Sequence, residues 1–220
     1  MSLTLALSTS QSTASVALLK DGVVLNEFFT EKGVSYSEGL LMVVDKLMYA
    51  SNTNISDIDF FAVDVGPGSF TGVRIGVTVI NAFAHVFSKP AIEVSSLYGL
   101  RFIRKDYPIL CSIIDARNGN AYAALYRHGS ALIEPSAVVV EDFLRRMPKG
   151  TLFVGDGAKI YRERIFDLVH EPRFMREHIN VLKASFIGLA AFEKQKCEEF
   201  TIMAVPMYLR SSQAERMKNV

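Results

Sequence analysis

The chain has 220 residues, half of them hydrophobic, with a mean hydropathy of +0.22 and a formal net charge of +1. That length is enough for one large or two small domains, and the surplus of apolar residues implies a large core, an exposed apolar patch, or both. The 24 basic and 23 acidic residues form no basic stripe, which argues against strong independent binding of nucleic acid. The two cysteines, Cys111 and Cys197, match no metal-binding pattern, as expected of reduced thiols in a cytoplasmic protein.

The first half of the chain predicts a strand-rich unit followed by helices. Alternating or β-branched stretches predict strands at residues 3–7, 15–19, 23–30, 58–65 and 91–94. Helical spacing of apolar residues predicts helices at 35–50, 73–87 and 95–107. Ser35 and Glu38 fit a capping box at the start of the first helix. The opening residues lack the basic segment of a signal peptide, and no run reaches the length expected of a membrane span.

The second half repeats this order with shorter connections. Strands are predicted at residues 108–115, 121–126, 130–134 and 152–154. Helices are predicted at 140–147, 159–169 and 183–197, before an extended segment at 204–210 and a polar tail at 211–220. A shift of 107 positions aligns Ser8 with Asp115 and Gly22 with Gly129 without a gap. We therefore predict a duplicated α/β unit, with domains at 1–107 and 108–210.

A duplicated unit of this kind resembles the actin/Hsp70/sugar-kinase superfamily. The resemblance implies two ribonuclease-H-like domains, each a mixed sheet with helices on its faces, with the second domain reduced. In that superfamily the two domains face each other across a nucleotide cleft.

The segment that links the strand at 58–65 to the following helix is a glycine loop, Val65 to Gly76. Its glycines permit a tight turn, and free N–H groups at a helix start favour an anion. One interpretation is an anion or nucleotide site; the other is a strand-to-helix turn without a ligand. The loop matches neither of the two best-known phosphate-binding fingerprints. The candidate anion-binding residues are Gly66, Gly68, Ser69 and Thr71.

Paired carboxylates are missing from the positions where phosphoryl chemistry would need them. Active members of the superfamily usually carry Asp after the first strand of each domain, where carboxylates hold Mg²⁺ or position the attacking group. Here the first position is Ser8, and only Asp115 remains, two residues from Arg117, with which we expect a salt bridge. Asp64 is either a substitute carboxylate or a polar strand end. No catalytic residue and no metal ligand is assigned.

The helix after the glycine loop leaves almost no polar face, and the helix at 35–50 is also broadly apolar. A helix that lies on a sheet needs only one apolar stripe. We therefore expect these helices to contact a partner chain as well as their own sheet. The predicted partner or dimer interface residues are Leu40, Val44, Leu47, Met48, Ile75, Val79 and Phe83.

The run Gly66 to Gly76 resembles the signature of the TsaB (YeaZ) family, the short bacterial paralogues of the transferase TsaD, once called glycoprotease. Asp115-Ala-Arg117, with Ala121 and Tyr122, and the closing run Pro206 to Arg210 extend the resemblance over most of the chain. TsaD also carries H-x-x-x-H on its first helix, whereas the matching stretch here, 38–45, contains no histidine. Ser8 departs from the TsaB pattern, which usually has Asp at that position.

The resemblance implies a non-catalytic, cytoplasmic scaffold subunit that supports a TsaD-like transferase. That transferase forms N6-threonylcarbamoyladenosine (t6A) at position 37 of tRNAs that read ANN codons. The implied partners are the transferase, a TsaE-like ATPase and, in isolation, a second copy of the chain through the first two helices. The resemblance implies contact with tRNA only through the complex, no membrane, no cofactor of its own, and ATP or ADP only within the complex. Two alternatives are a small-molecule kinase or ATPase of the same superfamily and a glycoprotease-like metallopeptidase.

Overall fold

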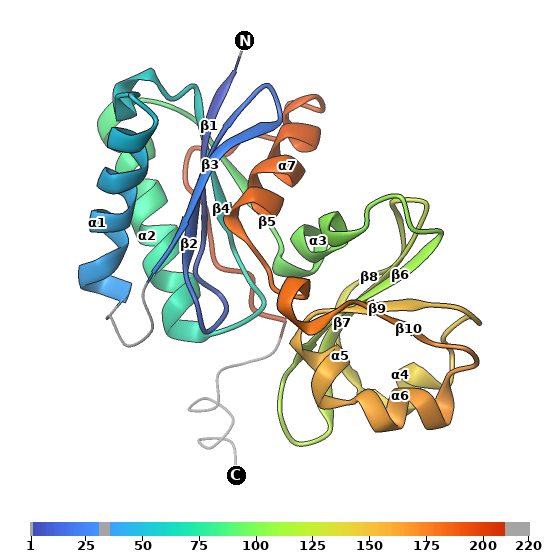
Figure 1. The fold of residues 1–220 in the computed structure, drawn as a ribbon. Coiled ribbons are helices and arrows are strands. Elements are labelled where there is room, and N and C mark those ends of the chain that lie inside the picture. Colours follow the sequence, from blue (N-terminus) through green and yellow to red (C-terminus); the bar gives the residue numbers. More distant parts are fainter. Residues whose placement is uncertain (1, 31–35, 210–220) are drawn as a thin grey trace.

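The computed structural model describes residues 2–30 and 36–209, which form two five-stranded mixed sheets (Figure 1). The first sheet has the order β3-β2-β1-β4-β5. Strands β1, β2 and β3 form an antiparallel meander, and β4 and β5 then extend the sheet in parallel beside β1. The strands are β1 (Leu3–Ser8), β2 (Ser15–Lys20), β3 (Val23–Phe29), β4 (Phe60–Asp64) and β5 (Ala91–Val94).

Helices cover both faces of the first sheet (Figure 1). α1 (Tyr36–Ala50) and α2 (Phe70–Phe87) pack on the face that carries the alternate leucines of β1 and β2, and a 3₁₀ turn, η1 (Ile55–Asp57), follows α1. The opposite face is covered by α7 (Ala184–Gln195). Both faces are buried, which explains why β1, β2 and β4 are almost continuously apolar.

The second sheet repeats the topology with the order β10-β9-β6-β7-β8. Its strands are β6 (Ile109–Asp115), β7 (Asn120–Arg127), β8 (Ser130–Val139), β9 (Leu152–Val154) and β10 (Arg173–Phe174). Read from β8, the order of antiparallel and parallel neighbours matches that of the first sheet. The predicted duplicated α/β fold is therefore confirmed, although the first hairpin of the second sheet is offset by one residue from a strict 107-residue shift.

Short helices complete the fold after β5. They are α3 (Ser96–Leu100), η2 (Arg101–Ile103), α4 (Val140–Leu144), α5 (Asp156–Ile160), α6 (Arg162–Leu168) and η3 (Glu177–Ile179). The helix predicted at 95–107 thus ends early and tightens into a 3₁₀ turn, and the one predicted at 159–169 divides at Tyr161. The predicted capping box at Ser35 and Glu38 and the tail at 211–220 lie outside the described residues.

α7 does not follow the predicted domain ranges. The strands do divide between the two sheets on either side of residue 107, but α7, from the range 108–210, packs on β1, β2, β4 and β5. Gly188 makes this contact close, because a Cβ there would overlap the side chain of Leu19. The first unit therefore includes a helix from the end of the chain.

One apolar core joins the two sheets. Arg101, only 6% exposed, lies at this junction and donates to the carbonyl of Gly129 (2.5 Å) and to the carboxylate of Glu193 on α7 (2.6 Å). Because it joins a hairpin of the second sheet to a helix of the first, Arg101 links the two halves of the molecule. Members of this core from both sheets, α3 and α7 include Leu19, Ile92, Leu97, Ile114, Tyr126 and Ile187.

Helix α2 is long and apolar enough, by length and composition alone, to cross a membrane, so the expectation that no run reaches this length is wrong. A single helix of this kind is weak evidence for a membrane span, because the core helix of a soluble protein can have the same length and composition. Here Val73, Val77 and Ile80 of α2 are buried in the core against the first sheet.

Candidate functional site

The carboxyl ends of β1 and β4 meet at one edge of the first sheet because these strands are parallel neighbours. Asp64, the last residue of β4, is fully buried there. Its Oδ2 accepts hydrogen bonds from Ser8 Oγ (2.9 Å) and Ser10 Oγ (2.5 Å). Its Oδ1 accepts from Ser96 Oγ (2.5 Å) and from the N–H of Gly66 (3.0 Å). We call this group of side chains around the carboxylate the Asp64 cluster.

Burial raises the pKa of Asp64, and the hydrogen bonds from Ser10 and Ser96 act against that rise. Hydroxyl and amide donors stabilise a carboxylate without adding a positive charge. All four donors come from the chain itself, so both carboxylate oxygens are already engaged. Of the two interpretations of Asp64, the arrangement fits a structural strand end better than a carboxylate presented to a ligand.

The glycine loop folds around the turn that follows β1. Cβ atoms at Gly68 and Gly72 would overlap the carbonyl oxygens of Ser10 and Thr9. Thr9 Oγ1 donates to the carbonyl of Gly72 (2.7 Å), and the N–H of Ser69 donates to the carbonyl of Ser10 (2.8 Å). Two of the loop glycines are therefore required for close contact between two segments of this chain.

The four candidate anion-binding residues lie together at the start of α2, in different settings. Ser69 is the N-cap, and its Oγ accepts from the N–H of Gly72 (3.2 Å). The N–H of Gly66 is used by Asp64, and Gly68 packs against Ser10. Thr71 is exposed on the first turn. Anion binding by this loop stays a prediction. The loop has fewer free N–H donors than its sequence suggests, because the N–H of Gly66 already binds Asp64.

The second sheet contains a counterpart of the Asp64 cluster. Asp115, at the end of β6, accepts hydrogen bonds from the hydroxyl of Tyr161 and from the N–H of Arg117 (3.0 Å). Asp156 accepts from the N–H groups of Asp115 (3.2 Å) and Gly157 (2.8 Å). Burial raises the pKa of Asp156, and these two N–H groups oppose the rise.

The expected salt bridge between Asp115 and Arg117 is wrong: the two residues interact through the N–H of Arg117, and no ion pair joins them in the described structure. Tyr161 takes the place of the guanidinium. Within residues 2–30 and 36–209, no three His, Cys, Asp or Glu side chains gather as a metal site would require.

The predicted interface residues separate into two groups. On α1, Leu40, Val44, Leu47 and Met48 are at most 7% exposed and belong to the core beneath the helix. The prediction is wrong for these four, because side chains already buried in their own chain offer no surface to a partner. On α2, Ile75, Val79 and Phe83 are half-buried at the margin of the same core.

The exposed side of these two neighbouring helices carries large apolar side chains among the exposed polar residues Asp45, Lys46, Arg74 and His85. On α1, Leu41 is 48%, Met42 59% and Tyr49 90% exposed; on α2, Val86 is 70% exposed. Thr78 and Ala82 are exposed between the first turn of α2 and Val86. We call this surface the α1–α2 face, and its residues are Leu41, Met42, Tyr49, Thr78, Ala82 and Val86. The prediction that these helices contact a partner stays a prediction, and on α1 only the side opposite to Leu40, Val44 and Leu47 is available for such a contact.

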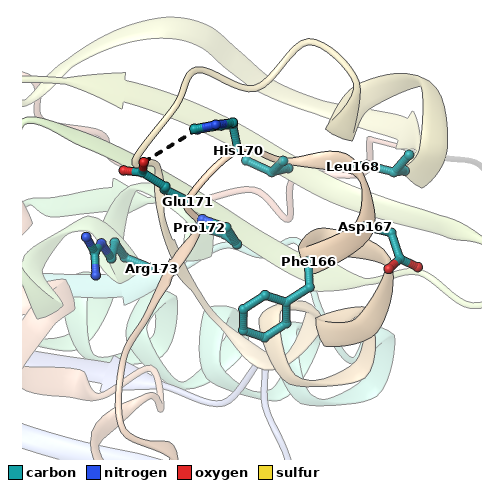
Figure 2. A pocket seen from close by; sticks show the side chains of 8 residues that line it. Phe166, Asp167, Leu168, His170, Glu171, Pro172 and Arg173 are labelled. Atoms are coloured by element: carbon teal, nitrogen blue, oxygen red, sulfur yellow. Dashed lines mark ion pairs between the residues drawn. The ribbon is translucent and has the colours of Figure 1, made fainter.

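A separate hollow of about 640 Å³ lies at the end of α6, lined by the consecutive residues 166–173 (Figure 2). His170 Nδ1 lies 3.8 Å from the carboxylate of Glu171, which also pairs with Lys149 (2.9 Å). These groups are exposed, and the Glu171 carboxylate is paired with Lys149, so the hollow shows no catalytic arrangement.

Comparisons with known proteins show which family this chain resembles over most of its length. The family model described as TsaD, tRNA N6-adenosine threonylcarbamoyltransferase, matches residues 31–217. A Bacillus subtilis relative named tRNA threonylcarbamoyladenosine biosynthesis protein TsaB is 30% identical over 96% of this chain and 95% of its own.

Solved structures agree with this relationship. YeaZ from Pseudomonas aeruginosa superposes with a TM-score of 0.76 at 27% identity, covering 95% of this chain and all of its own. An inorganic polyphosphate/ATP-glucomannokinase from Arthrobacter superposes with a TM-score of 0.52 at 14% identity, covering 89% of this chain and all of its own. This last likeness shows the fold alone, the duplicated sugar-kinase type that the sequence predicted.

Proposed function

The chain belongs to the TsaB (YeaZ) family of tRNA threonylcarbamoyladenosine biosynthesis proteins, and from this premise we propose that it is a non-catalytic subunit of a t6A-forming complex. In this proposal it binds a TsaD-like transferase and supports the formation of t6A at position 37 of ANN-reading tRNAs. A TsaE-like ATPase joins the complex. The tRNA and ATP or ADP bind to the assembled complex and not to this chain alone. The chain acts in the cytoplasm and pairs with itself when the transferase is absent.

The α1–α2 face is the observation that carries the proposal. A protein surface that presents several large apolar side chains on two adjacent helices favours association with another protein. The exposed apolar residues Leu41, Met42, Tyr49 and Val86 lie on two neighbouring helices whose buried sides already cover the sheet. A second pair of helices from a partner would cover them in the manner of a helix bundle.

The Asp64 cluster supports a role without chemistry of its own. An ionised carboxylate offers about four lone-pair sites, and a site that is already used is not available to a metal or a substrate. Both oxygens of Asp64 accept hydrogen bonds from Ser8, Ser10, Ser96 and Gly66. The glycine loop packs on the chain itself, which favours its role as the start of α2 over a role as a phosphate cradle.

Reconstitution with the transferase and the ATPase of the same organism tests the proposal. The mixture also contains tRNA, ATP and the synthase that supplies the threonylcarbamoyl donor. We expect no t6A from the chain alone, t6A from the full mixture, and at least about tenfold less when this chain is omitted. Substitution of Met42→Glu or Ala82→Glu should weaken binding to the transferase by a similar factor, because a charge would be buried in the interface.

Arg145→Glu is a matched control, since Arg145 is exposed beside α4 on the second sheet. It should leave transferase binding unchanged. Wild-type binding by a folded Ala82→Glu protein would reject the α1–α2 face. Formation of t6A by the chain alone would reject the non-catalytic role.

A further inference from the structure

A hollow of about 430 Å³ opens beside α7. Its walls come from Gly22 in the β2–β3 turn, residues 102–106 after α3, and the C-terminal half of α7. We call it the α7 hollow. Because α7 and the α1–α2 pair cover opposite faces of the first sheet (Figure 1), a molecule in this hollow would not compete for the α1–α2 face.

The floor of the α7 hollow is apolar. Phe102, Ile103 and Leu189 are half-buried and pack on the core between the sheets. Phe192 stands next to the turn, because a Cβ on Gly22 would overlap its ring. A pocket with several apolar groups and a volume within about 300–1,000 Å³ can enclose a bulky side chain.

Strand β3 carries a further exposed apolar residue on the α7 side of the sheet. Val24 pairs with Leu19, and residues directly opposite each other on antiparallel strands share one face of the sheet. Leu19 packs under α7, so Val24 also lies on the α7 side, where it is 38% exposed. β3 is an edge strand, and within the described residues it pairs only with β2.

The rim of the α7 hollow carries a net positive charge. Its charged residues are Arg104, Lys105, Lys196, Asp106 and Glu193, and Arg104 Nε lies 3.7 Å from Asp106 Oδ1. Glu193 already binds two cations, Lys105 (2.7 Å) and the buried Arg101 (2.6 Å). Lys196 Nζ lies 5.0 Å from the centre of the Phe192 ring, and no carboxylate of the described residues pairs with it. A complementary ligand would therefore carry negative charge next to an apolar group.

We propose that the α7 hollow is a docking site for an acidic segment of a partner protein, which inserts one large apolar side chain onto Phe102, Leu189 and Phe192. A carboxylate next to that side chain faces Lys196. The apolar floor and exposed Val24 favour a protein segment over RNA, because phosphates would meet isolated cations instead of a continuous basic stripe. This site adds a second docking surface to the one on α1 and α2.

Selection from a displayed library of random twelve-residue peptides tests the proposal with the full chain as bait. We expect enriched peptides to combine Asp or Glu with a single Trp, Phe, Leu or Met. Synthesised peptides should bind about tenfold more weakly to Lys196→Glu and when the apolar residue is replaced by Ala, and binding should fall as salt rises. Lys196→Gln should give an intermediate loss, and Arg145→Glu should give none.

Lys196 is exposed, so its variants should keep the wild-type melting temperature, which circular dichroism checks. Enriched peptides without acidic residues would overturn the proposal, as would equal binding by Lys196→Glu. Failure of the library to yield any binder would overturn it too. Binding of a single-stranded RNA twelve-mer that Lys196→Glu weakens, with no bound peptide, would assign the site to nucleic acid instead.

Discussion

Ser8 Oγ donates a hydrogen bond of 2.9 Å to the buried carboxylate of Asp64. The two residues end adjacent parallel strands, so a small neutral donor stands beside a carboxylate that has no cationic partner among the described side chains. Each group provides a hydrogen-bond partner for the other in a buried setting: the hydroxyl of Ser8 donates, and the carboxylate of Asp64 accepts. This relationship gives Ser8 a structural role in the Asp64 cluster.

Ser8→Asp should destabilise the protein strongly near neutral pH. It would place a second carboxylate against Asp64, and two buried carboxylates in contact cannot both ionise without a large cost. We expect a loss of about 2–4 kcal/mol in the free energy of unfolding, from the cost of an unpaired buried charge. Urea unfolding at pH 7.5 and pH 5 should show a smaller loss at the lower pH, since protonation removes the repulsion.

Ser8→Asn is the control for this change, because it has the size of Asp without the charge. It should show no comparable dependence on pH. If Ser8→Asp and Ser8→Asn were equally stable at pH 7.5, repulsion between the carboxylates at positions 8 and 64 would not be the cause of the loss.

Gly72→Ala should also destabilise the protein, for a steric reason. A Cβ at this position would overlap the carbonyl oxygen of Thr9, which is backbone and has little room to move. Overpacking of this kind costs about 1–3 kcal/mol. Gly119→Ala is the comparison: no atom lies within 4 Å of its Cβ position, so only the strain of its φ of +72° remains. Chemical unfolding of both variants should give the larger loss for Gly72→Ala.

The succession of strands and helices along the chain was predictable because it follows from local patterns. The β1–β2–β3 meander, the glycine loop and their repeats after residue 107 each have their own apolar periodicity or turn residues. The location of α7 was not predictable in this way. An apolar helix indicates that it is buried but does not indicate which of two sheets covers it, and α7 crosses back to the first sheet.

The candidate site was predictable in part. Asp64 and the glycine loop were identified because they are adjacent in sequence, whereas Ser96 joins the Asp64 cluster from 32 residues away. The apolar stripe of α1 at Leu40, Val44 and Leu47 was predicted to contact a partner, but in the structure it packs against the first sheet. Hydrophobicity alone does not distinguish a stripe that covers its own sheet from one that awaits another chain.

Glu193→Gln should lower stability at neutral pH and have little effect in acid. Burial alone would raise the pKa of Glu193, but the hydrogen bond from Lys105 and the charge of Arg101 outweigh it and the net shift is downward. A carboxyl with a lowered pKa contributes stability above the ordinary glutamate pKa, and loses it as the pH falls through the pKa of the folded state. Glu193 is 32% exposed, so the effect at pH 7 should be on the order of 1 kcal/mol.

Urea unfolding of wild type and Glu193→Gln at a series of pH values measures this difference. It should shrink steadily as the pH falls below the range in which free glutamate titrates. A difference that stayed constant from pH 7 to pH 3 would show that packing of the amide, and not the ion pairs with Arg101 and Lys105, causes the loss.

Asn81→Ala should loosen the segment that follows α7 along α2. The Asn81 side chain donates to the carbonyl of Ala204 (2.9 Å) and accepts from its N–H (2.8 Å), so one residue satisfies both backbone groups. Its removal should cost about 1–3 kcal/mol and speed hydrogen exchange of the amides from Met203 to Met207. Asn81→Asp keeps the acceptor and should protect the N–H of Ala204 better than Ala does. Unchanged exchange in Asn81→Ala would mean that other contacts hold the segment, such as the hydrogen bonds from the N–H of Val205 to Glu93 (2.6 Å) and from the N–H of Met207 to the carbonyl of Val65 (2.7 Å).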